Sequence, residues 1–549
     1  MKNLLFACAA ACIFLAWLLP IHYRPWATYT GELYAFFALF ALAGVFLKQK
    51  LLLPKIALPL FGLALIPLIQ FAFGQVYYFS IALLGFLYVF GFGLAVAIGF
   101  SLCRDSGQRE KTFAYLSCTF LAGGVCTGLI AICQWLNLDS RLTAIMMDIH
   151  GNARPFANFA QPNNMGTFLL MALMACLYLH ETRRLPAKWL VLAAAPILIG
   201  VALSQSRTSW VACLCIMAYL SYQQYRHVIR LPWRYNLLWL SAFAALIFFL
   251  PHIGQWIAQA SDVQIIESRE LAQRAGGDMS RLAIWQQMLH AIAAQPWFGY
   301  GWYQTSSAFV SISDTFQGPV WIRSAHNFIL DFLLWNGLLI SLPFLAYFGY
   351  WGWQLHRRAN SAESVTGLLM AGVFIIHAML EFPQNYAYFL LPAGFILGAV
   401  QAQKTDTAVL TLPPVFMRVA FAAGAILLAV IYRDYAVLVP KLNQAAAYEK
   451  TPEKITRNER IYLLSEFDHR INFILINPYS KMTQAQLDEA EKLVRSYPTK
   501  YHLVKYAKML AYNGHEAEAR HQLWRLKAIH RKELSWSELI KDQPRSAER

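Results

Sequence analysis

Arg323 and His326 lie at the start of a long apolar run, in the stretch VWIRSAHNFILDFLLWNGLL (residues 320–339). Ser324 or Asn327 can cap a helix that begins here, which would place His326 at the N-terminal end of that helix. The positive end of the helix dipole favours neutral imidazole, the form that accepts a proton. His326 is therefore a candidate general base. The alternative is that His326 has a purely structural role at the membrane–water interface.

Two further arginines interrupt apolar sequence, Arg207 in SQSRTSW and Arg281 in SRLAIWQQM. An arginine at bilayer depth costs about 2.5–3.5 kcal/mol on insertion scales. Ser280 can cap a helix whose first turn carries Arg281, where a cation opposes the helix dipole. The alternatives are a snorkelling Arg207 and a surface-lying amphipathic helix around Arg281. Because guanidinium groups are forked donors for phosphate oxygens, we predict that both arginines bind an anion.

Amide, carboxyl and phenol groups occur in two other places between apolar runs. Gln161 lies in FAQPNN, and Glu381 and Tyr386 lie in HAMLEFPQNYAYF. The Gln161 segment resembles an ordinary helix start, with Pro162 in the first turn and Asn163 or Asn164 as a cap, and its alternative is donation of side-chain amides to a sugar or phosphate. Glu381 paired with an arginine would be a positioning ion pair, and Asn327 adds another amide beside His326. No Asp-x-Asp motif occurs near these residues, so the sequence predicts no metal and no cofactor.

The composition is that of a membrane protein. Hydrophobic residues make up 58% of the 549 residues and charged residues 14%, and the mean hydropathy is +0.41. A soluble domain carries about 25% charged residues. The net charge of +16 is spread over short loops, and no RNA-type aromatic motif appears, so we predict no nucleic-acid partner. The nine cysteines fall almost entirely in apolar runs and contain no zinc-type pair.

Apolar runs long enough to approach a membrane span occur about 13 times, with 12 to 14 as the range. The loops that follow the even-numbered runs are rich in Lys and Arg. By the positive-inside rule, these loops and the N-terminus lie in the cytoplasm, and the loops that follow the odd-numbered runs lie outside. We predict an all-α polytopic membrane protein with an uncleaved first helix. The runs are 4–20, 33–47, 51–71, 77–102, 113–136, 165–180, 189–203, 209–222, 237–250, 327–353, 365–380, 386–400 and 415–432.

Residues 1–432 are thus predicted to form a transmembrane domain with a large outer loop at about 251–325. Residues 433–549 are predicted to form a helical outer domain. Apolar residues recur three and four positions apart on both sides of a turn at Asn513–Gly514. This pattern predicts one helical hairpin of tetratricopeptide type, and the alternative is a small helical cap or docking domain. All the candidate polar groups fall in segments predicted to lie on the non-cytoplasmic side of the membrane. We therefore expect one site at that surface of the membrane, reached by a lipid-bound anionic donor.

The three blocks SQSRTSW, SRLAIWQQM and SAHNFILDFLLWNG resemble the arginine and histidine blocks of the O-antigen ligase and polymerase superfamily (the Wzy_C domain). PIHYRPW, ANFAQPNNMGT and HAMLEFPQNYAYFLLPAGFILG resemble more closely the bacterial protein O-oligosaccharyltransferases of PglL or PilO type. The resemblance covers residues 20–398 and extends to the tail. One departure is visible after Pro383, where Gln384 and Asn385 replace a leucine and an aromatic residue.

The resemblance implies transfer of a whole oligosaccharide from undecaprenyl diphosphate to Ser or Thr hydroxyls of pilin or other periplasmic proteins. It also implies a multi-pass protein of the bacterial inner membrane whose active site faces the periplasm. By the same resemblance His326 is the essential base, Arg207 and Arg281 lie at the diphosphate, and Gln161 and Tyr386 match family positions. Inversion at the anomeric carbon is expected from displacement at its far face.

Two other functions compete with protein glycosylation. One is ligation of O-antigen to lipid A-core, or polymerisation of its repeat. The other is transport of a lipid-linked sugar, which is less favoured because transporters usually show inverted repeats and broken midplane helices, and the sequence has no such duplication.

Overall fold

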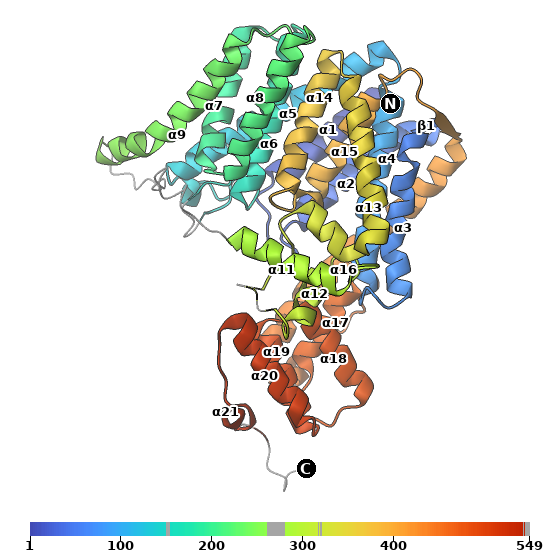
Figure 1. The fold of residues 1–549 in the computed structure, drawn as a ribbon, viewed down its shortest axis with the longest axis vertical. Coiled ribbons are helices and arrows are strands. Elements are labelled where there is room, and N and C mark those ends of the chain that lie inside the picture. The colour runs from blue at the N-terminus through green and yellow to red at the C-terminus, as the bar shows by residue number, and fades with distance from the viewer. Residues whose placement is uncertain (150–153, 261–279, 317, 319–320, 542, 544–549) are drawn as a thin grey trace. The chain divides into compact units, whose positions relative to one another are not determined.

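The computed structural model describes residues 1–149, 154–260, 280–316, 318, 321–541 and 543 (Figure 1). Within these residues the chain is mostly helical, and the strands are one short antiparallel pair, β1 (Leu51–Pro54) and β2 (Val409–Leu412). Eight of the described helices are long and apolar enough to cross a membrane, and four shorter helices are also apolar. The predicted class, an all-α polytopic membrane protein, is confirmed, while the number of crossings stays a prediction.

Each of the predicted apolar runs overlaps a helix. The third run is shortened because its first residues form β1, so that α3 begins at Leu58. These helices are α1 (Lys2–Leu18), α2 (Tyr29–Ala43), α3 (Leu58–Ala72), α4 (Phe79–Leu102), α5 (Ser106–Trp135), α6 (Pro162–Glu181), α7 (Ala187–Leu203), α8 (Arg207–Tyr225), α9 (Arg234–Ala260), α13 (Phe328–Arg357), α14 (Ala362–Ala378), α15 (Ala387–Gln401) and α16 (Pro414–Ala447).

The segment predicted as one outer loop at 251–325 is partly helical. Helix α9 continues through Pro251 to Ala260, and α11 (Ser280–Ala294) and α12 (Thr305–Ile312) follow. The end of the last apolar run likewise does not end a helix, since α16 continues to Ala447. Polarity marks where a chain leaves lipid, whereas a helix ends only where its backbone hydrogen bonds end. Residues 261–279 lie outside the described part of the loop.

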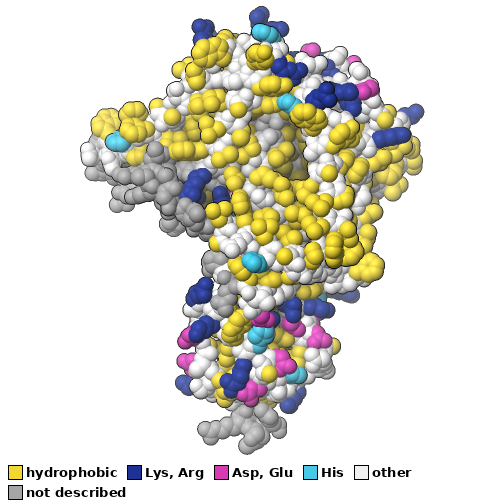
Figure 2. All heavy atoms as spheres, viewed as in Figure 1, with side chains coloured by type: hydrophobic (Ala, Val, Ile, Leu, Met, Phe, Trp, Pro, Cys, Tyr) yellow, Lys and Arg dark blue, Asp and Glu magenta, His cyan; other side chains and the backbone are white. Residues whose placement is uncertain are grey.

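The chain divides into two compact units. The first contains residues 1–63, 88–277 and 348–423, and the second contains residues 64–87, 278–347 and 424–549. Hydrophobic side chains cover much of the apolar helices on the face seen in Figure 2, as expected for surfaces that lie against lipid. Leu237 and Phe248 of α9 and Val419 of α16 are examples, each at least half exposed.

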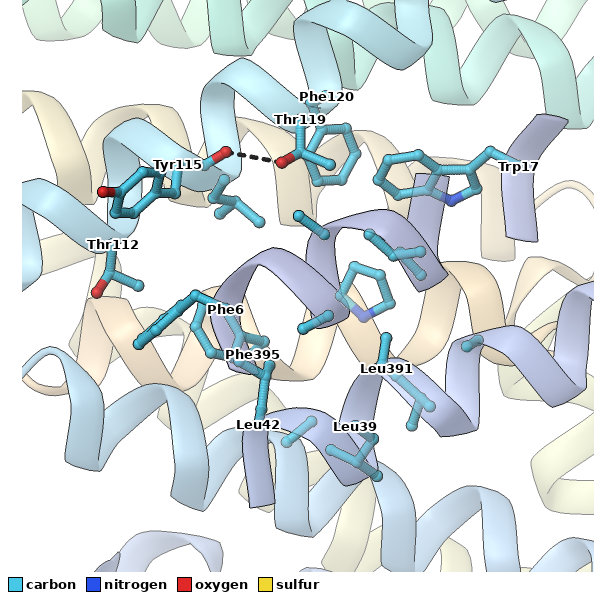
Figure 3. Close-up of a pocket in the computed structure, with 18 residues that line it drawn as sticks. Phe6, Trp17, Leu39, Leu42, Thr112, Tyr115, Thr119, Phe120, Leu391 and Phe395 are labelled. Atoms are coloured by element: carbon cyan, nitrogen blue, oxygen red, sulfur yellow. Dashed lines mark hydrogen bonds between the residues drawn. The ribbon is translucent and has the colours of Figure 1, made fainter. Parts of the chain in front are cut away.

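The first unit is a helical bundle with close backbone packing. A Cβ added to Gly99 of α4 would lie 2.1 Å from the carbonyl oxygen of Phe395 in α15, so only glycine permits this approach. Trp17 of α1 is 1% exposed, packs on Phe168 and donates to the Tyr388 carbonyl at 3.0 Å. A cavity between α1, α2, α5 and α15 is lined almost wholly by apolar side chains and holds none of the candidate catalytic residues (Figure 3).

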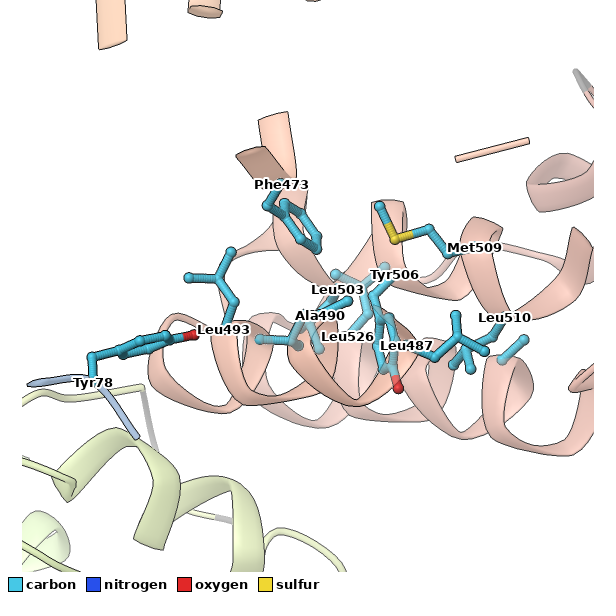
Figure 4. Packing of buried hydrophobic residues seen from close by; sticks show 12 residues of the cluster. Tyr78, Phe473, Leu487, Ala490, Leu493, Leu503, Tyr506, Met509, Leu510 and Leu526 are labelled. Atoms are coloured by element: carbon cyan, nitrogen blue, oxygen red, sulfur yellow. The ribbon is translucent and has the colours of Figure 1, made fainter. Parts of the chain in front are cut away.

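The second unit contains the polar tail, which is helical as expected. Its helices are α17 (Ser465–Leu475), α18 (Gln484–Ser496), α19 (Lys500–Tyr512), α20 (Glu516–His530) and α21 (Trp536–Ile540). Helices α19 and α20 form the predicted hairpin, and Gly514 takes a φ of 86° at its turn. Tyr78, which precedes α4, reaches into the tail core beside Leu493 (Figure 4). The tail is therefore packed against the turn between α3 and α4.

Candidate active site

His326 is half-buried and lies just before α13, separated from its first residue, Phe328, by Asn327. Asn327 caps this helix, as predicted, because its Oδ1 accepts a hydrogen bond from the Leu330 amide at 3.1 Å. His326 itself has a φ of 51°, in the left-handed region that non-glycine residues rarely adopt. Such a conformation persists only where the surrounding structure holds it. The backbone around the proposed base is therefore specified by its contacts.

Three neighbouring elements hold this backbone. From α11, the indole Nε1 of Trp285 donates to the Ala325 carbonyl at 3.0 Å. From α13, the buried carboxylate of Asp331 accepts the Ala325 amide at 2.9 Å. From α12, the hydroxyl of Ser306 donates to the Ile322 carbonyl at 3.4 Å. Sequence reasoning missed all three partners, because each depends on which helices come together.

Arg281 lies on the same face of α11 as Trp285, the residue that contacts the loop of His326. Trp285 follows it by four residues, and side chains at that spacing share one face of a helix. Because Trp285 bonds to Ala325, the adjacent residue of the loop, Arg281 belongs to the same side of α11 as this contact. Helix α11 begins at Ser280 and ends at Ala294, before Pro296. Two predicted site residues are thus carried by neighbouring elements of one unit.

A kink in α13 anchors the segment that follows α11. Gly337 takes φ 67° and ψ 178°, which interrupts the regular helical hydrogen bonds. The Tyr300 amide donates to the Leu334 carbonyl at 2.8 Å, and the Leu338 amide donates to the Pro296 carbonyl at 2.7 Å. Gly299 takes a φ of 66°, in the left-handed region that favours glycine. The chain after α11 is thereby bound to the helix that follows His326.

Arg323 contacts the tail. Its guanidinium carbon lies 5.3 Å from the ring centroid of Trp321 and 4.5 Å from that of Tyr497, within the range of cation–π attraction. The phenol of Tyr497 donates to buried Glu466, a carboxyl whose pKa is raised by burial and partly lowered again by this hydrogen bond. The side chain of Arg323 is otherwise exposed. These contacts join the loop of His326 to α17 and α18.

Four other predicted residues lie in the first unit. Gln161 is the residue directly before α6, and Pro162 is the first residue of that helix, as predicted. The next residue, Asn163, donates through its side-chain amide to Glu381 at 2.9 Å. Asn164 lies close to Tyr386, and its side-chain amide partly offsets the burial that raises the pKa of the Tyr386 phenol. The start of α6 is thus bonded to the turn between α14 and α15 through Asn163, a contact that sequence reasoning had not predicted.

Arg207 is the first residue of α8 and is exposed, although its neighbours on both sides are buried. Ser206 caps the helix, accepting the Ser209 amide at 3.4 Å. This turn packs against α6, since a Cβ added to Gly166 would lie 2.4 Å from the Ser209 hydroxyl and 3.1 Å from that of Ser204. Arg207 therefore projects from a turn that is packed against α6, the helix that Gln161 directly precedes.

Unsatisfied polar atoms gather at these elements of the first unit. Within the described residues, four side-chain oxygens are buried there without a hydrogen-bond partner. They belong to Asn164, Gln205, Thr208 and Ser209. Buried polar groups are nearly always hydrogen-bonded, so an unsatisfied group calls for an explanation. A hydroxyl-rich or anionic ligand beside Arg207 would supply partners for them.

The candidate residues are divided between the two units. Gln161, Arg207, Glu381 and Tyr386 belong to the first, and Arg281, Arg323, His326 and Asn327 belong to the second. No group of three or more His, Cys, Asp or Glu side chains able to hold a metal ion occurs among the residues that the structure describes.

Two family models match the chain. Residues 190–345 match the model described as O-Antigen ligase, and residues 365–543 match the one described as Virulence factor membrane-bound polymerase, C-terminal. The first match contains Arg207, Arg281 and His326, and the second contains Glu381, Tyr386 and nearly all of the tail. Together with the apolar helices, these matches define a polytopic membrane enzyme of the O-antigen ligase superfamily.

The relatives narrow this class. Over 541 residues the chain is 38% identical to the general O-oligosaccharyltransferase of Acinetobacter baylyi, covering 98% of this chain and 94% of that protein. Over 522 residues it is 24% identical to the ComP-specific O-oligosaccharyltransferase of the same organism, covering 94% and 93%. The chain therefore belongs to the O-oligosaccharyltransferase family and is a glycosyltransferase, as its motifs predicted.

Proposed function

We propose that this enzyme transfers a preassembled oligosaccharide from undecaprenyl diphosphate to Ser or Thr hydroxyls of pilin or other periplasmic proteins. The reaction takes place at the periplasmic face of the bacterial inner membrane. The basic exits of the even-numbered apolar runs support this orientation through the positive-inside rule. The kinship with O-oligosaccharyltransferases supports a lipid-linked donor and a protein acceptor.

The observation that carries the proposed mechanism is the bracing of the His326 loop beside the face of α11 that bears Arg281. In the proposed step, the imidazole of His326 removes the proton of the acceptor hydroxyl as its oxygen attacks the anomeric carbon. The bond from that carbon to the diphosphate oxygen breaks at the same time, and displacement from the far face inverts the configuration. The proton stays on the imidazole until solvent removes it.

The lipid diphosphate is already a good leaving group, so its departure depends on charge stabilisation more than on a general acid. Donors fixed in advance at the developing charge are the most effective means of providing it. We assign this role to Arg281 and Arg207, whose guanidinium groups can each donate to two oxygens. No metal or cofactor is assigned to this step.

Substrate binding is assigned to the remaining candidates. Gln161 and Tyr386 would contact the sugar or diphosphate, and Glu381 would hold the start of α6 through its bond to Asn163. Asn327 orders the helix behind the base. Arg323 has an exposed side chain, so it can approach an anion while its guanidinium remains stacked on Tyr497.

Ligation of O-antigen to lipid A-core, or polymerisation of O-antigen, is the second candidate, and the match to the model described as O-Antigen ligase is the observation that favours it. Both full-length relatives are oligosaccharyltransferases instead, which favours a protein acceptor. Transport of a lipid-linked sugar finds no support in these relatives.

The test compares intact masses of pilin and other periplasmic proteins in cells with the gene, without it, and with the His326→Ala variant. We expect glycan-sized mass additions only with the native gene, because the variant lacks the base. O-antigen banding is measured in the same strains. Unchanged protein masses together with altered banding would support the ligase function, and normal glycosylation by His326→Ala would rule out the proposed base.

A further inference from the structure

Asp331 is a buried carboxylate with an unusual set of partners. It lies in the first turn of α13 and is 0% exposed. Its Oδ1 accepts the Ala325 amide at 2.9 Å and the Thr305 hydroxyl at 3.1 Å, and its Oδ2 accepts the Ser324 hydroxyl at 2.5 Å. A buried carboxylate is tolerated only where such donors replace water. Two of the three donors belong to the loop directly before His326.

The same network reaches His326 itself. The Ser324 hydroxyl that donates to Asp331 also accepts the backbone amide of His326 at 3.1 Å. Asp331 therefore fixes three consecutive residues, the last of them through the serine hydroxyl. This arrangement accounts for the left-handed conformation of His326, which an unsupported loop would rarely adopt. An acidic residue that only favoured the start of α13 would not need these loop contacts.

Further bonds make the surroundings of Asp331 stiff. The indole of Trp335 donates to the Thr305 hydroxyl at 2.8 Å, which orients that hydroxyl toward the carboxylate. The indole of Trp285 donates to the Ala325 carbonyl at 3.0 Å. The peptide unit between Ala325 and His326 is therefore bonded at both groups, its carbonyl by Trp285 and its amide by the Ser324 hydroxyl, and has little freedom to rotate. The position of the next residue, His326, follows from this peptide.

We propose that Asp331 is a positioning residue for the transfer reaction. It sets the backbone of residues 324–326 so that the His326 imidazole meets the acceptor hydroxyl in a reactive geometry. This inference rests on the proposed role of His326 as the base. Asp331 accepts its described hydrogen bonds from the protein, so its effect on the reaction passes through His326. A displacement of about 1 Å in such a group can lower a rate by roughly a hundredfold.

The test uses purified full-length enzyme with a lipid-linked oligosaccharide donor and an acceptor protein. Asp331→Asn keeps the shape of the side chain but presents an amide to groups that are all donors. We expect kcat to fall by roughly 10- to 100-fold, with KM for donor and acceptor within about twofold of the native values. Ser324→Ala removes the bond to Asp331 and the bond from His326, and should lower kcat in the same way.

Asp434→Asn is the matched control. Asp434 is also 0% exposed and accepts backbone amides of the tail, including Tyr462 at 2.9 Å and Leu463 at 2.6 Å. Its substitution should lower the Tm while leaving kcat per folded enzyme unchanged. If Asp331→Asn changes kcat no more than this control does, the positioning role is overturned. Should Asp331→Asn fail to accumulate, the kcat of Ser324→Ala decides the question.

The His326→Ala background separates this inference from the proposed function. There, adding Asp331→Asn should not reduce the residual rate further, because positioning acts only through the imidazole. A further loss would overturn the positioning role. If His326→Ala alone retains the native kcat, the proposed base fails. If His326→Ala is inactive while Asp331→Asn and Ser324→Ala keep native kcat, only the positioning inference fails.

Discussion

At the scale of single residues, the guanidinium groups differ in their surroundings. Arg323 is stacked on Tyr497, so part of its charge is engaged by the tail. Arg207 is exposed at the first residue of α8, among buried hydroxyl and amide side chains. Arg281 begins the α11 face that contacts the loop of His326. The location of each cation, rather than its residue type, distinguishes a structural contact from a proposed diphosphate contact.

Arg281→Ala should impair use of the lipid-linked donor more than use of the acceptor. We expect kcat/KM for the donor to fall by roughly 100- to 1000-fold, the range for removing one donor from a developing negative charge. Arg281→Lys should recover only part of this loss, because lysine cannot donate in a fork. Steady-state kinetics with each substrate varied in turn measure both effects.

Arg520→Ala is the control for this substitution. Arg520 belongs to α20 in the same unit, and its guanidinium pairs with Glu516 in an exposed contact. Exposed pairs contribute about 0–1 kcal/mol to stability, so this variant should keep native donor kinetics. Native donor kinetics in Arg281→Ala as well would contradict the diphosphate role of Arg281.

At the scale of elements, the kink of α13 determines how the segment after α11 is held. Gly337 adopts a backbone conformation available essentially to glycine alone. The space beside the Gly337 Cα is also filled, since a Cβ added there would lie 2.2 Å from the Trp297 carbonyl oxygen. The kink thus makes room for the chain between α11 and α12 to bond to α13. Straightening the helix would remove the contacts that lie behind His326.

Gly337→Ala should therefore destabilise the enzyme, by about 1–3 kcal/mol for the backbone conformation alone and more for the steric contact. We expect a lower Tm in detergent and lower abundance in membranes. Gly349→Ala on the same helix is the matched control, because no atom lies within 4 Å of its added Cβ. That variant should be as stable as the native enzyme or slightly more stable. An unchanged Tm in Gly337→Ala would contradict the account of the kink.

At the scale of the whole molecule, the tail is built into the second compact unit. Ser80 and the start of α17 exchange hydrogen bonds, with the Glu466 amide donating to the Ser80 hydroxyl at 3.1 Å. His521 of α20 contacts Asp314 at 2.9 Å, next to the end of α12. The family match over residues 365–543 likewise runs without interruption from α14 into the tail. A reaction assay should therefore use the full chain.

The absence of an Asp-x-Asp motif near the candidate residues predicts that the whole enzyme works without a divalent ion. Transfer by the purified full-length protein should keep its rate after treatment with EDTA. In the proposed mechanism, the arginines provide the positive charge that a metal would bring to the diphosphate. The rate is measured before and after chelation, and a loss that added Mg²⁺ or Mn²⁺ restores would contradict the prediction.

The sequence alone determined the helices and the residue types of the site. A long apolar run can lie in lipid only if its backbone bonds are satisfied within it, so the runs had to form helices. Local rules also predicted Asn327 as a cap, Pro162 at the first residue of α6 and the turn at Gly514, because each depends on residues only a few positions apart. The motifs predicted the family on the same short-range basis.

Only the tertiary structure decided which groups meet. The bonds from Asp331 to Thr305, from Trp285 to Ala325 and from Asn163 to Glu381 join different helices, and no local spacing specifies them. The stacking of Arg323 on Tyr497 joins a loop to a distant helix of the tail. Short-range hydrogen bonding fixes where each helix lies along the chain, whereas side-chain packing between helices fixes the surroundings of each functional group.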